Sequence, residues 1–455
     1  MARPLQWSRR AFSALILALF LVASQTGNAL AQGISLIRDA EIEALIREMS
    51  NPIFEAAGLE PQNVELLLVN DKSLNAFVAG GQNLFIHTGL LQRVENPGQL
   101  AGVVAHETGH IAGGHLARMP DAFRAATVAT ILSTILGAAA MAAGAGDAGI
   151  AIMQGGQHIA QRSVLAYSRA QESAADQAGL RFLENIGWSA EGFVEFMSIL
   201  ADQEVLSSSR QDPYVRTHPL TTERVAALRA GAQQSPYFHA TKAAAYQKRL
   251  SLIQAKLSGF LDKPMTVLRK YPETDTSLEG HYARAVAFHR VARMDAAMHE
   301  LDALIAKDPK NPYYYELYGQ ILFESGKVAE SVEPHRKSVQ YAPNEPLLKI
   351  NLARALVAMQ TPETDAEAKQ ILLDAVRLER DLPLAWHQLA IVYHNEGDEG
   401  MASLASAERY ALLGSAPNAF NHASRAFDLL PKGSPGWIRA GDILAEVKNF
   451  RDQQR

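Results

Sequence analysis

The five residues from His106 to His110 have the types and the spacing that a zinc hydrolase needs. They read His-Glu-Thr-Gly-His, so the two histidines are four positions apart. On an α-helix such positions lie on one face, about 40° apart, where two imidazoles can bind one Zn²⁺ ion. Glu107 can take a proton from a water at the metal and pass it to a leaving amine. The pattern therefore predicts peptide-bond hydrolysis with one zinc ion per chain.

A second helix is expected to supply the third metal ligand that a catalytic zinc site requires. Leu116 stands where the metzincin pattern places its third histidine, which excludes that class. His115 is nine residues from His106, about half a turn round a continuous helix, and is therefore expected to point away. Glu172 is the favoured candidate. It is four residues from Asp176, so Glu172 can bind the metal while Asp176 accepts the N–H of a ligand histidine.

The segment at 63–91, before the motif, is predicted to form a small β-meander. Short apolar runs alternate with polar residues, and a Gly-Gly-Gln-Asn turn at 80–83 separates two of them. Asn75, Ala76 and Phe77 begin the second run. An exposed edge strand there would pair with an extended substrate backbone, so these three residues are candidates for substrate binding.

Helices are predicted on both sides of these strands. Asn96 as N-cap and Pro97 at the first helical position begin a helix that is expected to continue to about Arg118. A second long helix is expected over residues 161–185. An earlier amphipathic helix is predicted within residues 32–60, where isoleucines and leucines recur at helical spacing.

Residues 1–31 are predicted to be a secretory signal peptide. The segment carries three arginines and no acidic residue, then an apolar run at 11–23 and a small-x-small cleavage pattern that ends at Ala31. The apolar run is short for a membrane span, so an uncleaved anchor is the less favoured alternative. Arg9 and Arg10 partly resemble a twin-arginine export signal, which leaves the export route open. The mature chain is therefore expected in the periplasm, either soluble or associated with a membrane.

The composition limits the remaining possibilities. The chain has 455 residues, 48% of them hydrophobic, which suggests roughly two to four domains with real cores. It contains no cysteine, so a disulfide scaffold, a thiolate metal site and a thiol nucleophile are excluded. The formal net charge of −5 argues against a nucleic-acid partner.

An apolar stretch at 125–153 lies between the two chemical segments. Residues 125–146 hold no charged residue and are rich in Ala, Gly, Ser and Thr. The favoured interpretation is a buried or lid-like helical hairpin. A segment that dips into a membrane surface is the alternative, while a true span, which needs about 20 apolar residues, is the least favoured.

The C-terminal part is predicted to be an array of tetratricopeptide-like repeats. Four prolines recur at intervals of 34, 37 and 34 residues: Pro312, Pro346, Pro383 and Pro417. A small residue lies seven positions after each of them: Gly319, Ala353, Ala390 and Ser424. A period of about 34 residues, with small residues that let neighbouring helices approach, is typical of such repeats. We expect a helical linker at 236–270 and the repeats over residues 271–455.

Five short motifs together resemble one enzyme family. In chain order they are Asn75-Ala76-Phe77, Gly89-Leu90-Leu91, the His106–His110 motif, Glu172-x-x-x-Asp176 and His218-Pro219. The combination resembles the exported zinc metallopeptidases related to the CAAX prenyl protease. With the repeats behind it, the chain resembles the β-barrel assembly-enhancing protease type. The resemblance implies a mainly α-helical fold with the small β-meander, in which a gluzincin-like metallopeptidase domain at 32–235 precedes an α-solenoid.

The resemblance also implies roles for single residues. His106, His110 and Glu172 would be the zinc ligands and Glu107 the general base. Asp176 matches a family position that acts either behind a ligand or as a proton donor, and the helical geometry favours contact with a ligand histidine.

His218 and Arg224 are expected near the metal, where more than one role is open. A neutral His218 would occupy the open position of the zinc and hold the enzyme inactive. Alternatively, His218 or Arg224 would stabilise the oxyanion of the tetrahedral intermediate. A histidine that only forms the turn before Pro219 is the structural alternative.

The sequence therefore predicts a zinc-dependent endopeptidase of the cell envelope. Its expected substrates are unfolded or misassembled proteins, including stalled outer-membrane proteins. The repeats are expected to dock substrate or the outer-membrane assembly machinery, a step that rests on the resemblance. The competing interpretation is a chaperone or assembly scaffold with a largely latent metal site. No nucleic acid is expected as a partner, and peripheral contact with a membrane stays open.

Overall fold

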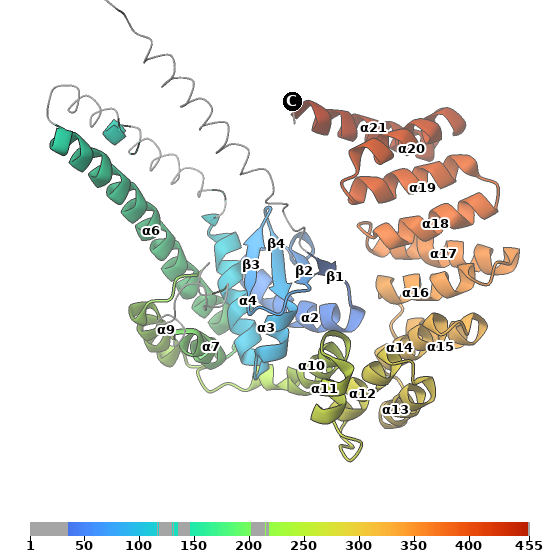
Figure 1. The fold of residues 1–455 in the computed structure, drawn as a ribbon, viewed down its shortest axis with the longest axis horizontal. Helices are drawn as coiled ribbons and strands as arrows, with labels where there is room; N and C mark the ends of the chain where they lie inside the picture. Colours follow the sequence, from blue (N-terminus) through green and yellow to red (C-terminus); the bar gives the residue numbers. More distant parts are fainter. Residues whose placement is uncertain are drawn as a thin grey trace, which may run out of the picture.

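The computed structural model describes residues 35–115, 117, 130, 132–134, 146–201, 214 and 218–453. The predicted signal peptide at 1–31 and most of the apolar stretch at 125–153 lie outside these residues. The prediction of a mainly helical chain with one small sheet is confirmed. Figure 1 shows an N-terminal body around the sheet, in blue and green, and an arc of paired helices, from yellow to red, that curves beside it.

The sheet has four strands in the order β1-β2-β4-β3. From β1 to β4 the bounds are Leu36–Ile37, Glu65–Val69, Ala76–Ala79 and Asn83–His87. β3 and β4 form the predicted hairpin, and Gly80 and Gly81 make its turn with φ angles of 60° and 101°. β2 pairs with β4 in parallel, so the predicted meander is wrong in its strand order. The connection at 70–75 carries the chain past the position that β4 fills, and β3 is left at the edge.

Helix α4 (Pro97–Ala112) runs through the centre of the N-terminal body. Asn96 caps it as predicted, because its Oδ1 accepts a hydrogen bond from the Gln99 N–H at 3.0 Å. Every residue from Gln99 to His110 is buried. A helix that is buried on all sides must accept neighbours on all sides, so α4 acts as the inner support of this body.

The other helices of the N-terminal body pack against α4, the sheet or, for α9, against α6 and α7. They are α2 (Ala40–Ala56), α3 (Thr88–Arg93), α6 (Gly146–Asn185), α7 (Glu191–Ala201) and α9 (Thr222–Gln234). The helices predicted within 32–60 and over 161–185 are confirmed as α2 and as part of α6. Small residues on α4 allow the close packing: a Cβ at Gly102 would lie 2.4 Å from the Cβ of Phe193 on α7.

The C-terminal part consists of paired helices, of which α10 and α11 fall within the segment predicted as a helical linker and the later ones within the predicted repeats. From α10 to α13 the bounds are Gln247–Leu261, Pro264–Lys270, Leu278–Arg290 and Met294–Lys307. From α14 to α17 they are Pro312–Glu324, Val328–Tyr341, Pro346–Val357 and Pro362–Leu378. From α18 to α21 they are Pro383–Asn395, Glu399–Leu412, Ala416–Leu429 and Pro435–Gln453. The recurring prolines lie in the first turns of α14, α16, α18 and α20, where their missing N–H costs nothing.

Within the part of the chain that the structure describes, no helix has the length and apolar character that crossing a membrane requires.

Buried polar contacts join the N-terminal body to the repeats. The Lys256 Nζ on α10 lies 3.2 Å from Oε2 of Glu41 on α2, and the Tyr282 hydroxyl on α12 donates to the same carboxylate at 2.5 Å. Farther along the arc, Arg38 beside β1 forms an ion pair of 2.9 Å with Glu379 after α17. The repeat arc is therefore tied to the N-terminal body near its start and again at its middle.

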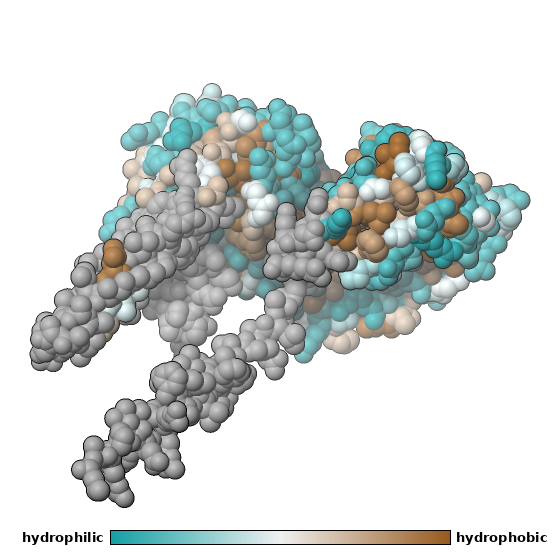
Figure 2. All heavy atoms as spheres, turned by 90° about the horizontal axis from the view of Figure 1, so that it is seen from above, coloured by the Kyte–Doolittle hydropathy of each residue, from teal (hydrophilic) through white to brown (hydrophobic). Residues whose placement is uncertain are grey.

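A cavity of about 510 Å³ lies between these contacts. Residues of β1 and α2 form one wall, and the inner faces of α14, α16 and α18 form the other. The repeat side combines apolar Leu347 and Leu384 with polar Glu316, Asn351 and Arg354. In Figure 2 the N-terminal body and the repeats appear as two lobes with a notch between them, and apolar surface is visible on both lobes.

Glu316 is expected to make the stability of this junction depend on pH. Burial raises the pKa of its carboxyl to about 7, although Lys256 opposes the shift. Between about pH 5 and pH 7 the folded chain therefore holds a proton that the unfolded chain has released, so stability falls as pH rises. We expect the free energy of unfolding in urea to decrease across this window, and Glu316→Gln to flatten the decrease. Glu330→Gln, at an exposed position of α15, serves as the control. An unchanged pH slope in Glu316→Gln would contradict the assignment.

Candidate metal centre

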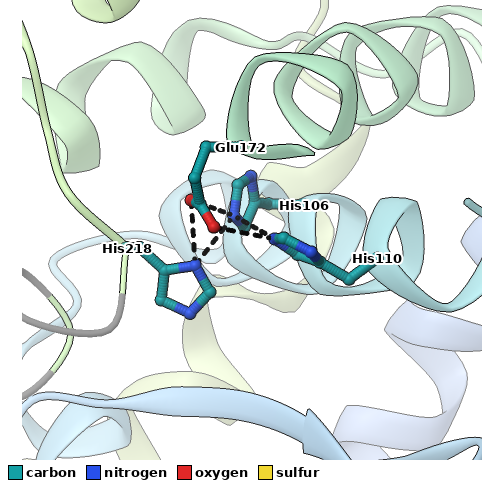
Figure 3. Close-up of side chains that lie close together, drawn as sticks. All are labelled: His106, His110, Glu172 and His218. Carbon is teal, nitrogen blue, oxygen red and sulfur yellow. Dashed lines mark hydrogen bonds and ion pairs between the residues drawn. The ribbon is translucent and has the colours of Figure 1, made fainter. Parts of the chain in front are cut away.

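Four buried side chains from three segments converge on one point (Figure 3). His106 and His110 lie on α4, Glu172 lies on α6, and His218 lies in the loop before α9. The His106 Nε2 is 3.1 Å from His110 Nε2, 3.3 Å from His218 Nδ1 and 3.4 Å from Glu172 Oε2. Glu172 is also 3.4 Å from His110 Nε2 through Oε1 and 3.0 Å from His218 Nδ1 through Oε2.

This donor set fits a zinc ion. Zinc bonds of about 2.0–2.1 Å at tetrahedral angles place neighbouring donor atoms about 3.3 Å apart. The separations of 3.0 to 3.4 Å match that value. Three buried carboxyl groups, those of Glu107, Glu172 and Asp176, lie in or beside this donor set, and a divalent ion would supply positive charge among them.

The close approach of α4 and α6 brings the ligands together. A Cβ at Gly109 would lie 2.8 Å from the Ala175 carbonyl oxygen and 2.9 Å from the Ala175 Cα, so only glycine fits there. Farther along the same contact, Gly179 of α6 lies against the backbone of Ala105 of α4. A Cβ at Gly179 would be 3.2 Å from the carbonyl carbon of Ala105. These contacts set the distance at which the Glu172 carboxylate reaches the two imidazoles.

Asp176 and Arg224 hold His106 from behind. The Asp176 Oδ1 lies 2.9 Å from His106 Nδ1, the nitrogen that faces away from the donor cluster. Arg224 donates to the same carboxylate through Nε and Nη2, at 2.8 and 2.9 Å. Burial alone would lower the pKa of His106, but its contacts with Asp176 and Glu172 outweigh burial and raise the pKa to about 10. The centre therefore favours positive charge where the donor atoms converge.

Arg224 is engaged by these carboxylates and not by the reaction space. Besides Asp176, its Nη1 lies 3.1 Å from Glu172 Oε2 and donates to the Pro219 carbonyl at 2.7 Å. The structure thus shows Arg224 in contact with Asp176 and with the main chain next to His218. Of the two residues considered for the oxyanion, His218 is the better placed.

Glu107 is fully buried beside the donor cluster. Its Oε1 lies 3.4 Å from His218 Nε2. Burial raises the pKa of the Glu107 carboxyl, although His218 and His106 lower it. A carboxylate with a raised pKa accepts protons more readily, which suits the predicted task of a general base.

Tyr214 is a residue of the centre that the sequence analysis missed. Its ring stacks on the His218 ring with centroids 4.5 Å apart, and its carbonyl accepts the His218 N–H at 2.8 Å. The Tyr214 N–H in turn donates to the Leu74 carbonyl, next to β3, at 3.4 Å. This tyrosine belongs to none of the five motifs. In the sequence it is marked only as an aromatic residue four positions, or about one helical turn, before His218.

His115 lies where the sequence analysis did not expect it. Its Nδ1 is 2.9 Å from His110 Nδ1, so the prediction that it points away is wrong. The reason is that α4 ends at Ala112 and not near Arg118, because Gly114 takes a left-handed conformation with φ of 61°. The prediction assumed that the helix continues without a break to His115. Because α4 ends before this residue, His115 lies beside the ligand candidate His110.

Asn75, Ala76 and Phe77 lie at the start of edge strand β3. The Asn75 carbonyl accepts the His87 N–H at 3.1 Å, and the Phe77 ring stacks on Phe85 at 4.8 Å. β3 also packs against α4, which carries Glu107. The structure therefore places the candidate substrate strand beside the centre, while the side chains of Asn75 and Ala76 are buried.

Known proteins are similar to the N-terminal body and, in some cases, to most of the chain. Residues 36–232 match the profile of peptidase family M48. A "Beta-barrel assembly-enhancing protease" from Yersinia pestis is 26% identical over 425 residues, which cover 92% of this chain and 86% of the relative. Its namesake from Escherichia coli K12 is 27% identical over 422 residues, 92% of this chain and 85% of the relative. "Metalloprotease YcaL" from Escherichia coli K12 is 29% identical over 171 residues, 37% of this chain and 61% of the relative.

Gly109→Ala tests the contact between α4 and α6. The added methyl group must push the α6 backbone away, so we expect a loss of about 1–3 kcal/mol in the free energy of unfolding, together with weaker metal binding. Urea denaturation and competition with a chromophoric chelator measure the two effects. Gly155→Ala is the matched control on α6, because a Cβ there meets nothing within 4 Å and should be neutral or slightly stabilising. Equal effects of the two substitutions would refute the argument.

Proposed function

We propose that this chain, whose residues 36–232 form a metallopeptidase domain of family M48, is a zinc-dependent endopeptidase of the cell envelope. The predicted family and the predicted enzyme class are confirmed by the family match and by the relatives. The metal, the cleaved proteins and the location are part of the proposal. The observation that carries it is the convergence of His106, His110 and Glu172 at 3.1 to 3.4 Å beside buried Glu107.

His106, His110 and Glu172 would hold the metal, and His218 is placed as a fourth donor. A zinc ion bound there would polarise the carbonyl of the scissile peptide bond and bring the pKa of a water molecule down to about 7. Glu107 would accept the proton of the attacking water and return it to the leaving nitrogen. Asp176 and Arg224 would keep His106 in the tautomer and ring plane that binding requires.

The position of His218 supports a latent ground state. Its Nδ1 lies 3.0 Å from Glu172 Oε2 and 3.3 Å from His106 Nε2, within the donor cluster itself. A catalytic zinc site keeps one position open for water or substrate. His218 in this place would fill that position, so it acts as a blocking residue that must move before cleavage.

Unfolded or misassembled proteins are the proposed substrates. Edge strand β3 lies beside α4, and an extended chain can add to such an edge by main-chain hydrogen bonds. Folded proteins rarely offer a free strand, so this mode selects unfolded segments. The names of the relatives that match most of this chain support stalled outer-membrane β-barrel proteins as the natural substrates.

The repeats are proposed to dock these substrates or the machinery that assembles them. The cavity between β1, α2 and the inner faces of α14, α16 and α18 offers apolar Leu347 and Leu384 beside Asn351 and Arg354. An extended segment of an unfolded client fits such a surface, because apolar side chains and main-chain polar groups both find partners there. Export by the predicted signal peptide would place the whole assembly in the periplasm.

Glu107→Gln separates an enzyme from a scaffold. The amide keeps the shape of the side chain but cannot take a proton, so we expect cleavage of a soluble unfolded protein such as casein to fall by at least about 100-fold with zinc content unchanged. Glu184→Gln, at an exposed position of α6, is the control. A variant that cleaves at the wild-type rate would refute the assignment of the base. A Glu107→Gln variant that fully supports outer-membrane assembly in cells would favour the chaperone or scaffold interpretation.

His218→Ala distinguishes the two roles considered for this histidine. If His218 blocks the metal, its removal opens a coordination position, and the basal rate of casein cleavage should rise several-fold. If His218 stabilises the oxyanion, the rate should fall by about 100-fold or more. Unchanged or lower activity would therefore contradict the blocking role. Zinc content, measured by elemental analysis, shows whether the site itself has survived.

A further inference from the structure

His115 contacts a proposed metal ligand through a specific pair of atoms. Its Nδ1 lies 2.9 Å from the Nδ1 of His110, the ring planes meet at 79°, and both side chains are at least nine-tenths buried. The His110 Nε2 faces the opposite way, toward His106 and Glu172. His110 is therefore held between the donor cluster on one nitrogen and His115 on the other.

Proton counting fixes the direction of this hydrogen bond. A neutral imidazole carries one N–H, and a nitrogen that binds metal cannot carry it. With Nε2 of His110 directed to the metal, the proton must sit on Nδ1, so His110 donates and His115 Nδ1 accepts. His115 must then be neutral, with its own proton on Nε2.

The backbone at Gly113 and Gly114 and a hydrogen bond from Gln171 place His115 beside His110. The left-handed Gly114 interrupts the helix after α4, and a Cβ at Gly113 would lie 2.5 Å from His115 Nε2. The His115 carbonyl accepts a hydrogen bond of 3.3 Å from Gln171 Nε2 on α6. Gln171 directly precedes Glu172. His115, which contacts the proposed ligand His110, is therefore hydrogen-bonded to the residue next to a second proposed ligand.

The two ligand histidines of α4 therefore have different supports. Asp176, a carboxylate, faces His106, whereas a neutral imidazole faces His110. A carboxylate at 115 would add negative charge to a buried cluster that already holds three carboxylates. A neutral acceptor orients the ring without changing the charge that a divalent ion balances.

We propose that His115 is a positioning residue that holds His110 in the ring orientation and tautomer required for metal binding. This inference rests on the proposed function, since it takes His110 as a ligand. Removing a group that orients a ligand in this way typically weakens metal affinity by about 10- to 100-fold. The loss would come from the missing acceptor and not from the missing volume.

The test compares variants that differ in the acceptor alone. Asparagine and leucine have nearly the same shape, but only asparagine can accept the His110 N–H. In the mature full-length protein, we expect His115→Asn to bind Zn²⁺ nearly as tightly as wild type in chelator competition. His115→Leu and the ring-sized His115→Phe should bind about 10- to 100-fold more weakly. His299→Phe, at an exposed position of α13, is the control.

Measurements without activity make the outcomes distinct. Melting temperatures of the metal-free proteins report any purely structural damage, and the absorption spectrum of Co²⁺-loaded protein reports ligand geometry. Equal zinc affinity of the asparagine and leucine variants would overturn the role of His115. If the wild type bound no zinc, or if His106→Ala left zinc binding unchanged, the proposed function would fail and this inference with it. If His115→Leu does not fold, the zinc affinities of His115→Asn and His115→Phe are compared instead, and equal affinities would likewise overturn the role of His115.

Discussion

The close contact between α4 and α6 is the constraint on which the rest of the molecule depends. The proposed ligands come from positions as far apart in the chain as His106 and His218, and their donor atoms must meet within 4.8 Å of one another. Contact of the Gly109 backbone with Ala175 sets that distance on the α6 side, and Phe193 packed on Gly102 supports α4 two turns closer to its N-terminus. Because α4 is buried along its length, the imidazoles project from a helix that has little freedom to move. Geometry at the metal centre is therefore a property of backbone packing, and the small residues of α4 belong to the site as much as its ligands do.

The charged side chains round this contact favour a bound cation at the point where the donor atoms converge. Arg224 binds both oxygens of Asp176, which leaves that carboxylate to orient His106 and not to compete for the metal. Glu172 faces the imidazoles, where burial opposes its ionised form but His218 and His106 hold the pKa of its carboxyl below the ordinary range. Desolvation makes each of these carboxylates costly unless a positive partner is near, so the folded domain and a bound divalent ion stabilise one another.

Local patterns predicted the chemical face of each helix but not the contacts that cross the chain. The four-residue spacings of His106 with His110 and of Glu172 with Asp176, and the proline period of the repeats, depend only on helical geometry, and such features can be found in sequence. The parallel pairing of β2 with β4 depends on where a distant strand packs, and nothing within 63–91 encodes it. His115 was misplaced because a glycine pair ended a helix that the periodicity continued. Tyr214 is marked only by its spacing of four residues from His218, and that spacing becomes informative only once His218 is known to lie at the centre.

If His218 blocks the centre as proposed, its position would link binding of substrate to release of the metal site. His218 stacks on the ring of Tyr214 and donates its main-chain N–H to the Tyr214 carbonyl, and Arg224 donates to the carbonyl of the next residue, Pro219. A stacked ring contributes about 0.5–1.5 kcal/mol and a hydrogen bond a similar amount, so each of these contacts is small beside the binding energy of an added strand. Tyr214 is bonded to the carbonyl of Leu74, directly before the segment that enters β3. An extended chain that adds to β3 therefore acts on the same short segment that holds Tyr214, and binding energy gained along the strand is available to move His218. On this argument an unfolded client would open the site that cleaves it, whereas a folded protein, which cannot add a strand, would leave His218 in place.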